Sequence, residues 1–342
     1  MSTRITAPGL WRKPVDDEMA RLDHPWFKHL VRLENTISCE TVMFYKELGL
    51  ITIHLPITTG SISSPMGRGS DSSPVCVDLF GQRTYLADSM QFMLEYGCRL
   101  HEKGCYYLMP SFRGEQADKR HLCQFYHSEA EIPGDLKDVM ALAERYLRYL
   151  CTKLLEYNCE DIIAIAGTTK HLQEFLALPS IPRVTMDQAV ALLDHLESDI
   201  PLYTTDPVYH FRSITPAGER ELMRLRGGYV WLTHFDHLSV PFYQAFGTDT
   251  SKAENADLLF GIGEVVGSGE RHATGEEVRS ALALHEVGQD EYQWYMQMKD
   301  KKPMKTSGFG LGIERFLLWV LQHDDIRDCQ LLSRFNGVTC LP

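Results

Sequence analysis

The stretch Ser307-Gly-Phe-Gly-Leu-Gly-Ile-Glu-Arg315, followed directly by Phe316-Leu-Leu-Trp-Val-Leu321, decides how the rest of the sequence is interpreted. Glycine alternates with larger residues in its first half, which is typical of a strand whose backbone a ligand can approach closely. An apolar helix follows, with Arg315 in its first turn. Gly310 and Gly312 are therefore candidate ligand contacts. Alternating glycines alone are a weak signal, so the interpretation depends on what accompanies them.

A second cluster lies upstream and consists of Phe112-Arg-Gly-Glu115, then Arg120-His121, then Phe125. It reads as a charged loop between two strands, and such a hairpin can wrap a polyphosphate. The guanidinium of Arg113 offers phosphate oxygens a planar, permanently charged fork. Phe125 gives an adenine ring a flat surface. Taken alone, the same residues could form only a surface ion pair.

A third cluster combines carboxylates with glycines and runs Asp257-Leu-Leu-Phe-Gly-Ile-Gly-Glu264, then Gly267-Ser-Gly-Glu-Arg271. Asp257 and Glu264 could share Mg²⁺ ions that neutralise ATP. Arg271 could clamp a carboxylate or an amide oxygen. The alternative for this cluster taken alone is an exposed turn that carries charges.

Composition limits the class of protein. The 342 residues suit one large domain or two small ones, and the formal net charge of −12 argues against a protein whose main task is gripping a polyanion. No apolar run is long enough to span a membrane, and Met1–Asp17 lacks the apolar stretch of a secretory signal. The nine cysteines show no CxxC pairing, which favours reduced thiols and a cytoplasmic location.

Hydrophobic periodicity predicts an α+β fold with long antiparallel strands and helices between them. Between 125 and 132, residues alternate so that Phe125, His127 and Glu129 share one face with Glu131. The predicted helices cover 24–48, 89–103, 135–157, 185–196 and 215–225. The predicted strands cover 50–56, 75–85, 106–112, 125–132, 230–242 and 256–266.

In their order and spacing, the three clusters resemble motifs of class II aminoacyl-tRNA synthetases, in the subgroup for Asp, Asn and Lys. FRGEQADKRHLCQFYHSEAE (112–131) resembles motif 2, and SGFGLGIERFLLWVLQHDDIRD (307–328) is very close to motif 3. GIGEVVGSGER (261–271) matches the segment between them. Looser matches are FYKELGLITIHLPI (44–57), similar to motif 1, and YLADSMQFMLE (85–95). The resemblance covers roughly residues 31–334.

This resemblance implies a catalytic domain over residues 26–342, built as an antiparallel β-sheet flanked by helices, after an N-terminal arm at 1–25. Residues 158–240 would form a variable, partly helical insert. The implied activity is that of an ATP-dependent ligase, in which a carboxylate attacks ATP in line and yields an acyl-adenylate and pyrophosphate.

The resemblance also assigns nucleotide contacts. Arg113 would bind the α-phosphate and the reacting carboxylate, which makes it a catalytic candidate together with Arg315. Glu115 would read the adenine amino group, and His121 would hold the distal phosphates. Phe125 and Arg315 would stack on the two faces of adenine, with Arg315 also touching the γ-phosphate.

Further implied partners are a metal and a second subunit. Asp257 and Glu264 would hold Mg²⁺, and the motif 1 proline, here Pro56, lies at a homodimer interface in the family. Intact members also carry an oligonucleotide-binding barrel before motif 1. Motif 1 begins here near residue 40, so charging of tRNA is doubtful on this interpretation.

Four positions address the amino acid. Gln91 matches a residue near the α-amino group, and Arg271 matches the arginine that recognises the side-chain carbonyl. Aspartate enzymes place a lysine where this chain has Leu94, and asparagine enzymes have the glutamate found here as Glu129. An apolar residue in place of that lysine, together with an added anion, would tolerate a second carboxylate poorly. The pocket therefore resembles an asparagine pocket.

Two positions depart from the family. The loop 58–74 lacks the glutamate that binds the α-amino group, and Asp71 is the carboxylate in that loop that could substitute for it. His127 replaces a usually apolar residue on the face shared by Phe125 and Glu129. It is either a satisfied core histidine or a general acid/base for altered chemistry.

These observations predict an enzyme that adenylates asparagine, aspartate or a close analogue and passes the acyl group to ammonia or another small nucleophile. Three alternatives stay open. One is a truncated asparaginyl-tRNA synthetase that charges tRNA. Another is ATP-dependent dehydration of the asparagine side-chain amide to a nitrile. The third is a catalytically silent paralogue that acts as a binding module.

Overall fold

A large mixed sheet forms the centre of the computed structural model, which describes residues 4–12, 19–63 and 73–337. Its eight strands follow the order β1-β5-β6-β13-β12-β11-β10-β7. The interior pairs are antiparallel, whereas β1/β5 and β10/β7 at the two edges are parallel. In the same order the strands are Ile51–Thr52, Cys105–Phe112, Gln124–Pro133, Thr306–Gly312, Gly263–Glu270, Asn255–Phe260, Tyr229–Thr233 and Arg183–Thr185. The predicted α+β class is confirmed.

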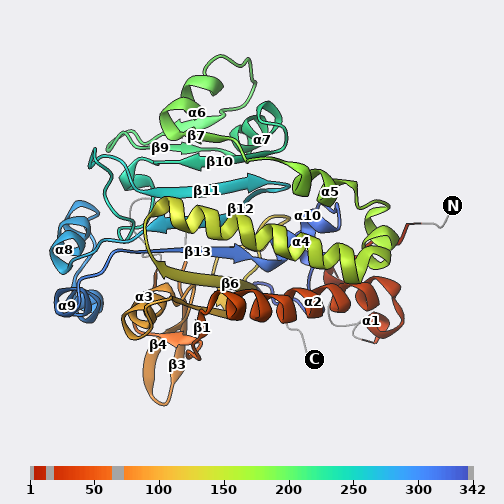
Figure 1. Ribbon diagram of the computed structural model, residues 1–342, viewed down its shortest axis with the longest axis horizontal. Helices are drawn as coiled ribbons and strands as arrows, with labels where there is room; N and C mark the ends of the chain where they lie inside the picture. The colour runs from red at the N-terminus through yellow and green to blue at the C-terminus, as the bar shows by residue number, and fades with distance from the viewer. Residues whose placement is uncertain (1–3, 13–18, 64–72, 338–342) are drawn as a thin grey trace.

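Two long helices, α2 (Pro25–Leu48) and α4 (Leu136–Ala166), lie side by side across one face of the sheet (Figure 1). Local sequence explains their ends. The ring of His24 accepts a hydrogen bond from the amide of Trp26, and Gly49 ends α2 in the left-handed conformation at φ 77°. Asp135 begins α4 with a reciprocal capping box. The main hydrophobic core fills the space between these helices and the sheet.

Successive residues of β13 point alternately into this core and toward the opposite face of the sheet. Phe309 and Leu311 are buried in the core with α4 residues. Gly308 and Gly310 take the opposite positions and leave room for side chains from the neighbouring strand β6. A Cβ at Gly308 would come within 1.8 Å of Glu131 Oε2, and one at Gly310 within 3.2 Å of Glu129 Oε1.

Smaller elements surround the face of the sheet opposite α2 and α4. The helix α3 (Gln91–Leu100) packs on β5 and β6. A three-stranded sheet of β2 (Thr58–Thr59), β3 (Val75–Leu79) and β4 (Gln82–Leu86) projects beside it. The helices α8 and α9 (Gly275–Leu284, Gln293–Lys301) form a pair with its own hydrophobic cluster. The helix α10 (Ile313–Val320) follows β13, and the short α1 (Ala20–Asp23) precedes α2.

The residues between α4 and β11 include the strands β7 and β10 at one edge of the sheet and the helices and ribbon that surround them. The helices α5, α6 and α7 cover Lys170–Ala177, Met186–Leu193 and Pro216–Leu225, and the ribbon β8/β9 covers Tyr203–Thr205 and Arg212–Ile214. Single 3₁₀ turns occur at Leu10–Arg12, His237–Ser239, Asp290–Tyr292 and Ile326–Asp328. Among the described residues, no helix is both long and apolar enough to cross a membrane.

Several predicted elements differ from the structure. The strand predicted over 75–85 is a hairpin, because Phe80 and Gly81 adopt positive φ values of 54° and 75° and reverse the chain. The strand predicted over 50–56 is regular only at Ile51–Thr52, beyond which the Ile53 amide still donates to the Tyr106 carbonyl of β5. The helix predicted to end near 157 continues to Ala166 across a kink at Asn158.

Candidate active site

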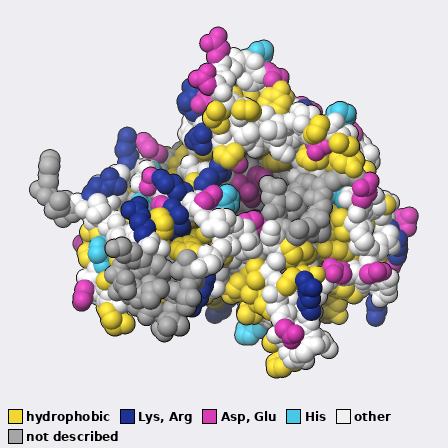
Figure 2. Space-filling view, turned by 180° about the vertical axis from the view of Figure 1, so that it is seen from behind, with side chains coloured by type: hydrophobic (Ala, Val, Ile, Leu, Met, Phe, Trp, Pro, Cys, Tyr) yellow, Lys and Arg dark blue, Asp and Glu magenta, His cyan; other side chains and the backbone are white. Residues whose placement is uncertain are grey.

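Two adjoining cavities lie on the sheet face opposite α2 and α4. One has a volume of about 380 Å³ and the other about 370 Å³. Four residues line both: Arg113, His127, Glu264 and Gly310. Figure 2 shows this side of the molecule, where basic and acidic side chains gather around a central hollow. All three sequence clusters therefore meet at one site.

Three guanidinium groups meet in the second cavity, which we call the cationic cavity: Arg113, Arg120 and Arg315. Arg120 pairs with Glu219 at 2.6 Å, and Arg315 donates to the Glu264 carbonyl at 2.7 Å while its guanidinium lies 3.6 Å from the Glu264 carboxylate. Burial lowers the pKa of Arg315, and the neighbouring Arg113 and Arg120 act in the same direction. Arg120 and Arg315 thus have carboxylate neighbours, whereas Arg113 forms no ion pair within the described residues.

Unpaired polar atoms point to a ligand in the cationic cavity. Glu115 accepts a hydrogen bond from the Ser73 amide with Oε1, whereas its buried Oε2 has no partner within the described residues. Nε of Arg113 and two nitrogens of Arg120 are likewise buried and unpaired there. An unpaired buried polar atom is costly unless a ligand or water satisfies it. An anion with an amino-bearing ring would satisfy both kinds of group.

The remaining predicted nucleotide residues line the same cavity. Phe125 packs 5.7 Å from the Arg113 guanidinium and edge-on against His127. Gly312 lies at the start of α10. His121 is about half-exposed and contacts Asp118 at 2.9 Å. Burial and Arg315 lower the pKa of His121, so its ring is mostly neutral at neutral pH.

Asp257 and Glu264 face the boundary of the two cavities from neighbouring strands β11 and β12. A Cβ at Gly267 would lie 2.9 Å from Glu264 Oε1 and 3.7 Å from Asp257 Oδ1, so both oxygens stand over the same glycine. Burial, Glu264 and Glu219 raise the pKa of Asp257 well above its ordinary value.

This donor set fits a magnesium ion bound through few protein ligands. Among the described residues, no group of three or more His, Cys, Asp or Glu side chains encloses a metal position. Mg²⁺ usually keeps several waters and binds through one or two carboxylates together with substrate phosphates. A divalent cation would also add to the counter-charge that Arg315 gives the crowded carboxylates Asp257 and Glu264.

The first cavity, which we call the acidic cavity, ends at a buried ion pair. Arg271 contacts Glu131 at 3.3 Å and donates to Gln244 Oε1 at 3.1 Å. Its guanidinium lies 5.3 Å from the ring centre of Tyr243. Burial raises the pKa of Glu131 to about 7, although Arg271 acts in the opposite direction. Arg271 thus presents a positively charged but partly neutralised surface to the cavity.

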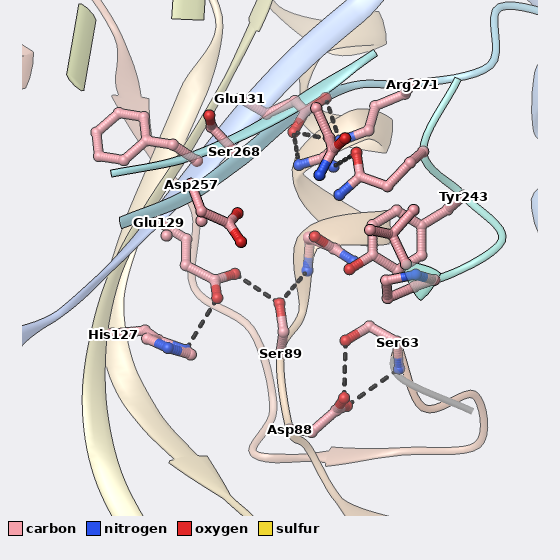
Figure 3. Close-up of a pocket in the computed structure, with 18 of the residues that line it drawn as sticks. Ser63, Asp88, Ser89, His127, Glu129, Glu131, Tyr243, Asp257, Ser268 and Arg271 are labelled. Carbon is pink, nitrogen blue, oxygen red and sulfur yellow. Dashed lines mark hydrogen bonds and ion pairs between the residues drawn. The ribbon is translucent and has the colours of Figure 1, made fainter. Parts of the chain in front are cut away.

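On another side of this cavity, Glu129 receives hydrogen bonds from two side chains and forms an ion pair with a third, and Figure 3 shows its contacts with Ser89 and His127. His127 Nδ1 lies 2.9 Å from Oε1, while Ser89 at 2.6 Å and Tyr107 donate to Oε2. Burial alone would raise the pKa of Glu129, but these donors, His127 foremost, hold it below its ordinary value. Glu129 is therefore a fixed carboxylate.

The helix α3 contributes the last predicted residues. Gln91 begins the helix and lines the acidic cavity, and its buried Nε2 has no partner within the described residues. Leu94 lies one turn later, also lines the cavity and is 1% exposed. Asp71, the predicted substitute for the α-amino glutamate, lies outside the described residues. A different carboxylate, Asp88, lines the cavity and accepts from the amide and hydroxyl of Ser63 at 3.0 and 2.9 Å.

Sequence reasoning missed several of the residues that line the cavities. The sequence assigns Arg120 no role, although its position beside His121 in the motif 2 loop is a usable signal. Glu131 shares the face of Glu129, so its inward direction was predictable but its pairing with Arg271 was not. The others come from loops that lacked a sequence pattern: Ser63, Asp88, Tyr243 and Gln244.

Comparisons with known proteins agree with this geometry. The family described as tRNA synthetases class II (D, K and N) matches residues 14–336. A probable cytoplasmic asparagine–tRNA ligase of Encephalitozoon cuniculi is 31% identical over 269 residues, which is 75% of this chain and 57% of that protein. An asparagine–tRNA ligase of Thermoplasma acidophilum is 26% identical over 88% of this chain and 68% of its own length. The chain thus spans little more than half of the first relative.

Among solved structures, asparaginyl-tRNA synthetase from Pyrococcus horikoshii in complex with asparaginyl-adenylate has the same fold. The TM-score is 0.86 at 23% identity, with 98% of this chain and 74% of that chain covered. The Entamoeba histolytica asparaginyl-tRNA synthetase, also complexed with asparaginyl-adenylate, gives a TM-score of 0.81 at 22% identity, with 98% and 73% covered.

Proposed function

The chain belongs to the class II tRNA synthetases (D, K and N), and from this we propose that it activates asparagine with ATP. The α-carboxylate of asparagine attacks the α-phosphorus of ATP. One C–O–P linkage forms, the bond to the β-phosphate breaks, and the products are asparaginyl-adenylate and pyrophosphate.

One observation supports this proposal above all: the cationic cavity adjoins the acidic cavity, and Arg113 lines both. The cationic cavity combines three guanidiniums with the unpaired Glu115 Oε2, which suits a triphosphate and an adenine amino group. The acidic cavity suits a zwitterion with a polar side chain. Arg113 lines both, so it lies where the α-phosphate and the carboxylate of the two substrates would meet.

In this mechanism the protein positions the reactants and offsets their charge. Arg113 contacts the phosphate that gains a fifth oxygen in the transition state, and Arg315 binds the distal phosphates from the start of α10. A Mg²⁺ ion held by Asp257 and Glu264 would offset phosphate charge. Gln91 offers its unpaired Nε2 to an oxygen of the amino acid.

Charge favours asparagine over aspartate. The acidic cavity contains the carboxylate of Glu129, whose pKa is held below its ordinary value. Glu131 partly neutralises Arg271, so a substrate that brings a second carboxylate would face Glu129 without a full counter-charge. An amide side chain adds no charge, and its NH₂ can donate to the fixed carboxylate of Glu129.

There are two candidate acceptors for the activated amino acid. We propose tRNA first, because relatives that share this catalytic core are named asparagine–tRNA ligases. The second candidate is ammonia or a small amine, which the net charge of −12 favours over a polyanion. An outer face of α2 that exposes Val31, Val42 and Met43 suits the homodimer that the resemblance implies, which stays a prediction.

The test of the proposal is pyrophosphate exchange. With ATP and Mg²⁺, asparagine should support exchange of labelled pyrophosphate into ATP, and aspartate should do so at least about tenfold less efficiently, a difference of about 1.4 kcal/mol. Adding total tRNA, ammonium chloride or small amines and following AMP and products by mass spectrometry then identifies the acceptor. No exchange with any amino acid would leave only the silent binding module.

A substitution at Leu94 tests the basis of the asparagine preference. Leu94→Lys places an ammonium beside the carboxylate-rich wall, so the exchange efficiency of aspartate relative to asparagine should rise about tenfold or more. Leu94→Met is the matched control, since it conserves volume without charge and should keep the wild-type ratio. Thermal unfolding of both variants checks that the buried lysine leaves the fold intact. An unchanged ratio in a folded Leu94→Lys variant would contradict this account of specificity.

A further inference from the structure

His127 lies at the boundary of the two cavities and lines both. It comes from β6, where its neighbours on the same face are Phe125 in the cationic cavity and Glu129 in the acidic one. The ring stands edge-on to Phe125, with centroids 4.8 Å apart and an interplanar angle of 87°. The ring orientation is thus fixed on one side by an aromatic contact and on the other by a carboxylate.

The surroundings of Nδ1 determine the tautomer. Nδ1 lies 2.9 Å from Glu129 Oε1 and 2.9 Å from Ser111 Oγ. The hydrogen bond of Nδ1 is with Ser111, and the adjacent anionic Oε1 of Glu129 favours a hydrogen rather than a lone pair on Nδ1, so Nε2 holds the lone pair in the neutral ring. The carboxylate of Glu129 is itself fixed by Ser89 and Tyr107.

Nε2 is left available for a ligand. Within the described residues it has no hydrogen-bond partner, and it is absent from the fully buried unpaired atoms, so it is accessible from the cavity. A histidine that served only to satisfy the core would have both nitrogens paired or enclosed. This histidine instead combines a paired Nδ1 with an Nε2 that is accessible at the boundary of the two cavities; Figure 3 shows its ring beside Glu129.

We propose that His127 accepts the proton of the nucleophile that attacks the acyl-adenylate, and that Glu129 stabilises the imidazolium formed. The inference rests on the proposed function. An N–H or O–H nucleophile attacks the carbonyl carbon, its new bond to carbon forms, and the carbon–oxygen bond to AMP breaks, with the electron pair leaving on AMP. The proton passes to Nε2 and then to solvent. A carboxylate that holds the Nδ1–H tautomer and offsets the imidazolium charge is an effective partner for such a base.

This role separates the two half-reactions. Adenylation joins a carboxylate to phosphorus and releases pyrophosphate, so no proton leaves the nucleophile and His127 has no proton to accept. Acyl transfer deprotonates the nucleophile, and a positioned base accelerates such a step by about 10²–10⁴-fold. A residue that merely supported the cavity wall would affect both half-reactions together.

The experiment compares His127→Asn with wild type. Asn keeps a donor toward Glu129 but lacks any atom at the Nε2 position. Pyrophosphate exchange with asparagine reports any loss of substrate binding through the contact with Glu129, and it should fall by a clearly smaller factor than acyl transfer; the exchange that remains also shows that the variant is folded. Hydroxylamine then serves as the probe nucleophile, added to enzyme-bound adenylate with pyrophosphatase present. Formation of asparagine hydroxamate should slow at least about tenfold.

Tyr126→Phe is the matched control, because Tyr126 precedes His127 on β6 and its side chain is 46% exposed. Both activities should be retained in this variant. A second variant, His127→Gln, guards against a local distortion specific to Asn and should show the same separation of steps. Unchanged hydroxamate formation, or an equal loss of exchange and transfer, would overturn the proposal. Absence of exchange in wild type would instead refute the underlying function.

Discussion

Replacing Arg315 with Ala is expected to lower asparagine-dependent pyrophosphate exchange by about 10²–10³-fold, the usual cost of removing one preorganised charge donor from a reacting centre. Arg315 begins α10 at the mouth of the cationic cavity, and its side chain is 22% exposed. Within the described residues, its polar contacts are the carbonyl oxygen of Glu264 and, at 3.6 Å, the carboxylate of the same residue. Most of its hydrogen-bonding capacity therefore remains for a ligand.

Like charges around Arg315 strengthen this expectation. Arg113 and Arg120 both act to lower its pKa, so the three guanidiniums of the cationic cavity repel one another. The negative charge of a triphosphate offsets that repulsion. A variant that lacks one guanidinium therefore attracts the triphosphate less strongly. Arg315→Lys should recover only part of the activity, because an ammonium lacks the planar fork.

The controls for Arg315→Ala concern folding and surface charge. Arg224→Ala removes an exposed guanidinium on α7 that pairs with Glu221, and exchange should stay at the wild-type level. Circular dichroism and thermal unfolding of Arg315→Ala should match wild type closely. Normal exchange in a folded Arg315→Ala variant would refute the assignment of this residue to ATP.

The elements that sequence could predict share strong local signals. The helix over 25–48 has His24 and Gly49 at its ends and an apolar stripe between them, so local and tertiary preferences agree. The junction 307–320 was equally clear, since alternating glycines give way to an apolar helix. The alternation of β6 correctly placed Phe125, His127 and Glu129 toward one face.

Tertiary contacts explain the failures. A strand was predicted over 230–242, but β10 ends at Thr233 and His234 adopts a positive φ of 54°. Asp236 then accepts hydrogen bonds from the backbone and side chain of Arg212 and from Lys252. These partners lie far away in the sequence, so hydrophobic periodicity could not reveal the turn they impose. The same loop carries Tyr243 and Gln244 into the acidic cavity, which is why those residues were missed.

The buried ion pair between Lys299 and Glu95 is expected to contribute strongly to the free energy of unfolding. Lys299 on α9 and Glu95 on α3 are both 0% exposed and contact one another, and Lys299 also donates to the carbonyl of His272. Tyr295 donates its hydroxyl to the other oxygen of Glu95. Burial lowers the pKa of Lys299, with Glu95 acting in the opposite direction. The pair fastens α9 to the helix that presents Gln91.

Lys299→Met should destabilise the protein by about 3–5 kcal/mol, because it leaves the Glu95 carboxylate buried without a counter-charge. The measurement is the urea midpoint followed by tryptophan fluorescence. Lys301→Met on the same helix is the matched control, since Lys301 is exposed, and its effect should be within about 0.5 kcal/mol.

The double variant Glu95→Leu/Lys299→Met distinguishes a lost charge pair from lost packing. Apolar residues of similar size can replace a buried pair at little cost, so the double variant should unfold at a higher urea concentration than Lys299→Met alone. If packing were the cause, the second substitution would add to the first and lower the midpoint further. A Lys299→Met midpoint equal to that of Lys301→Met would show that Glu95 is not left as a buried anion. The ion pair would then not be what holds α9 against α3.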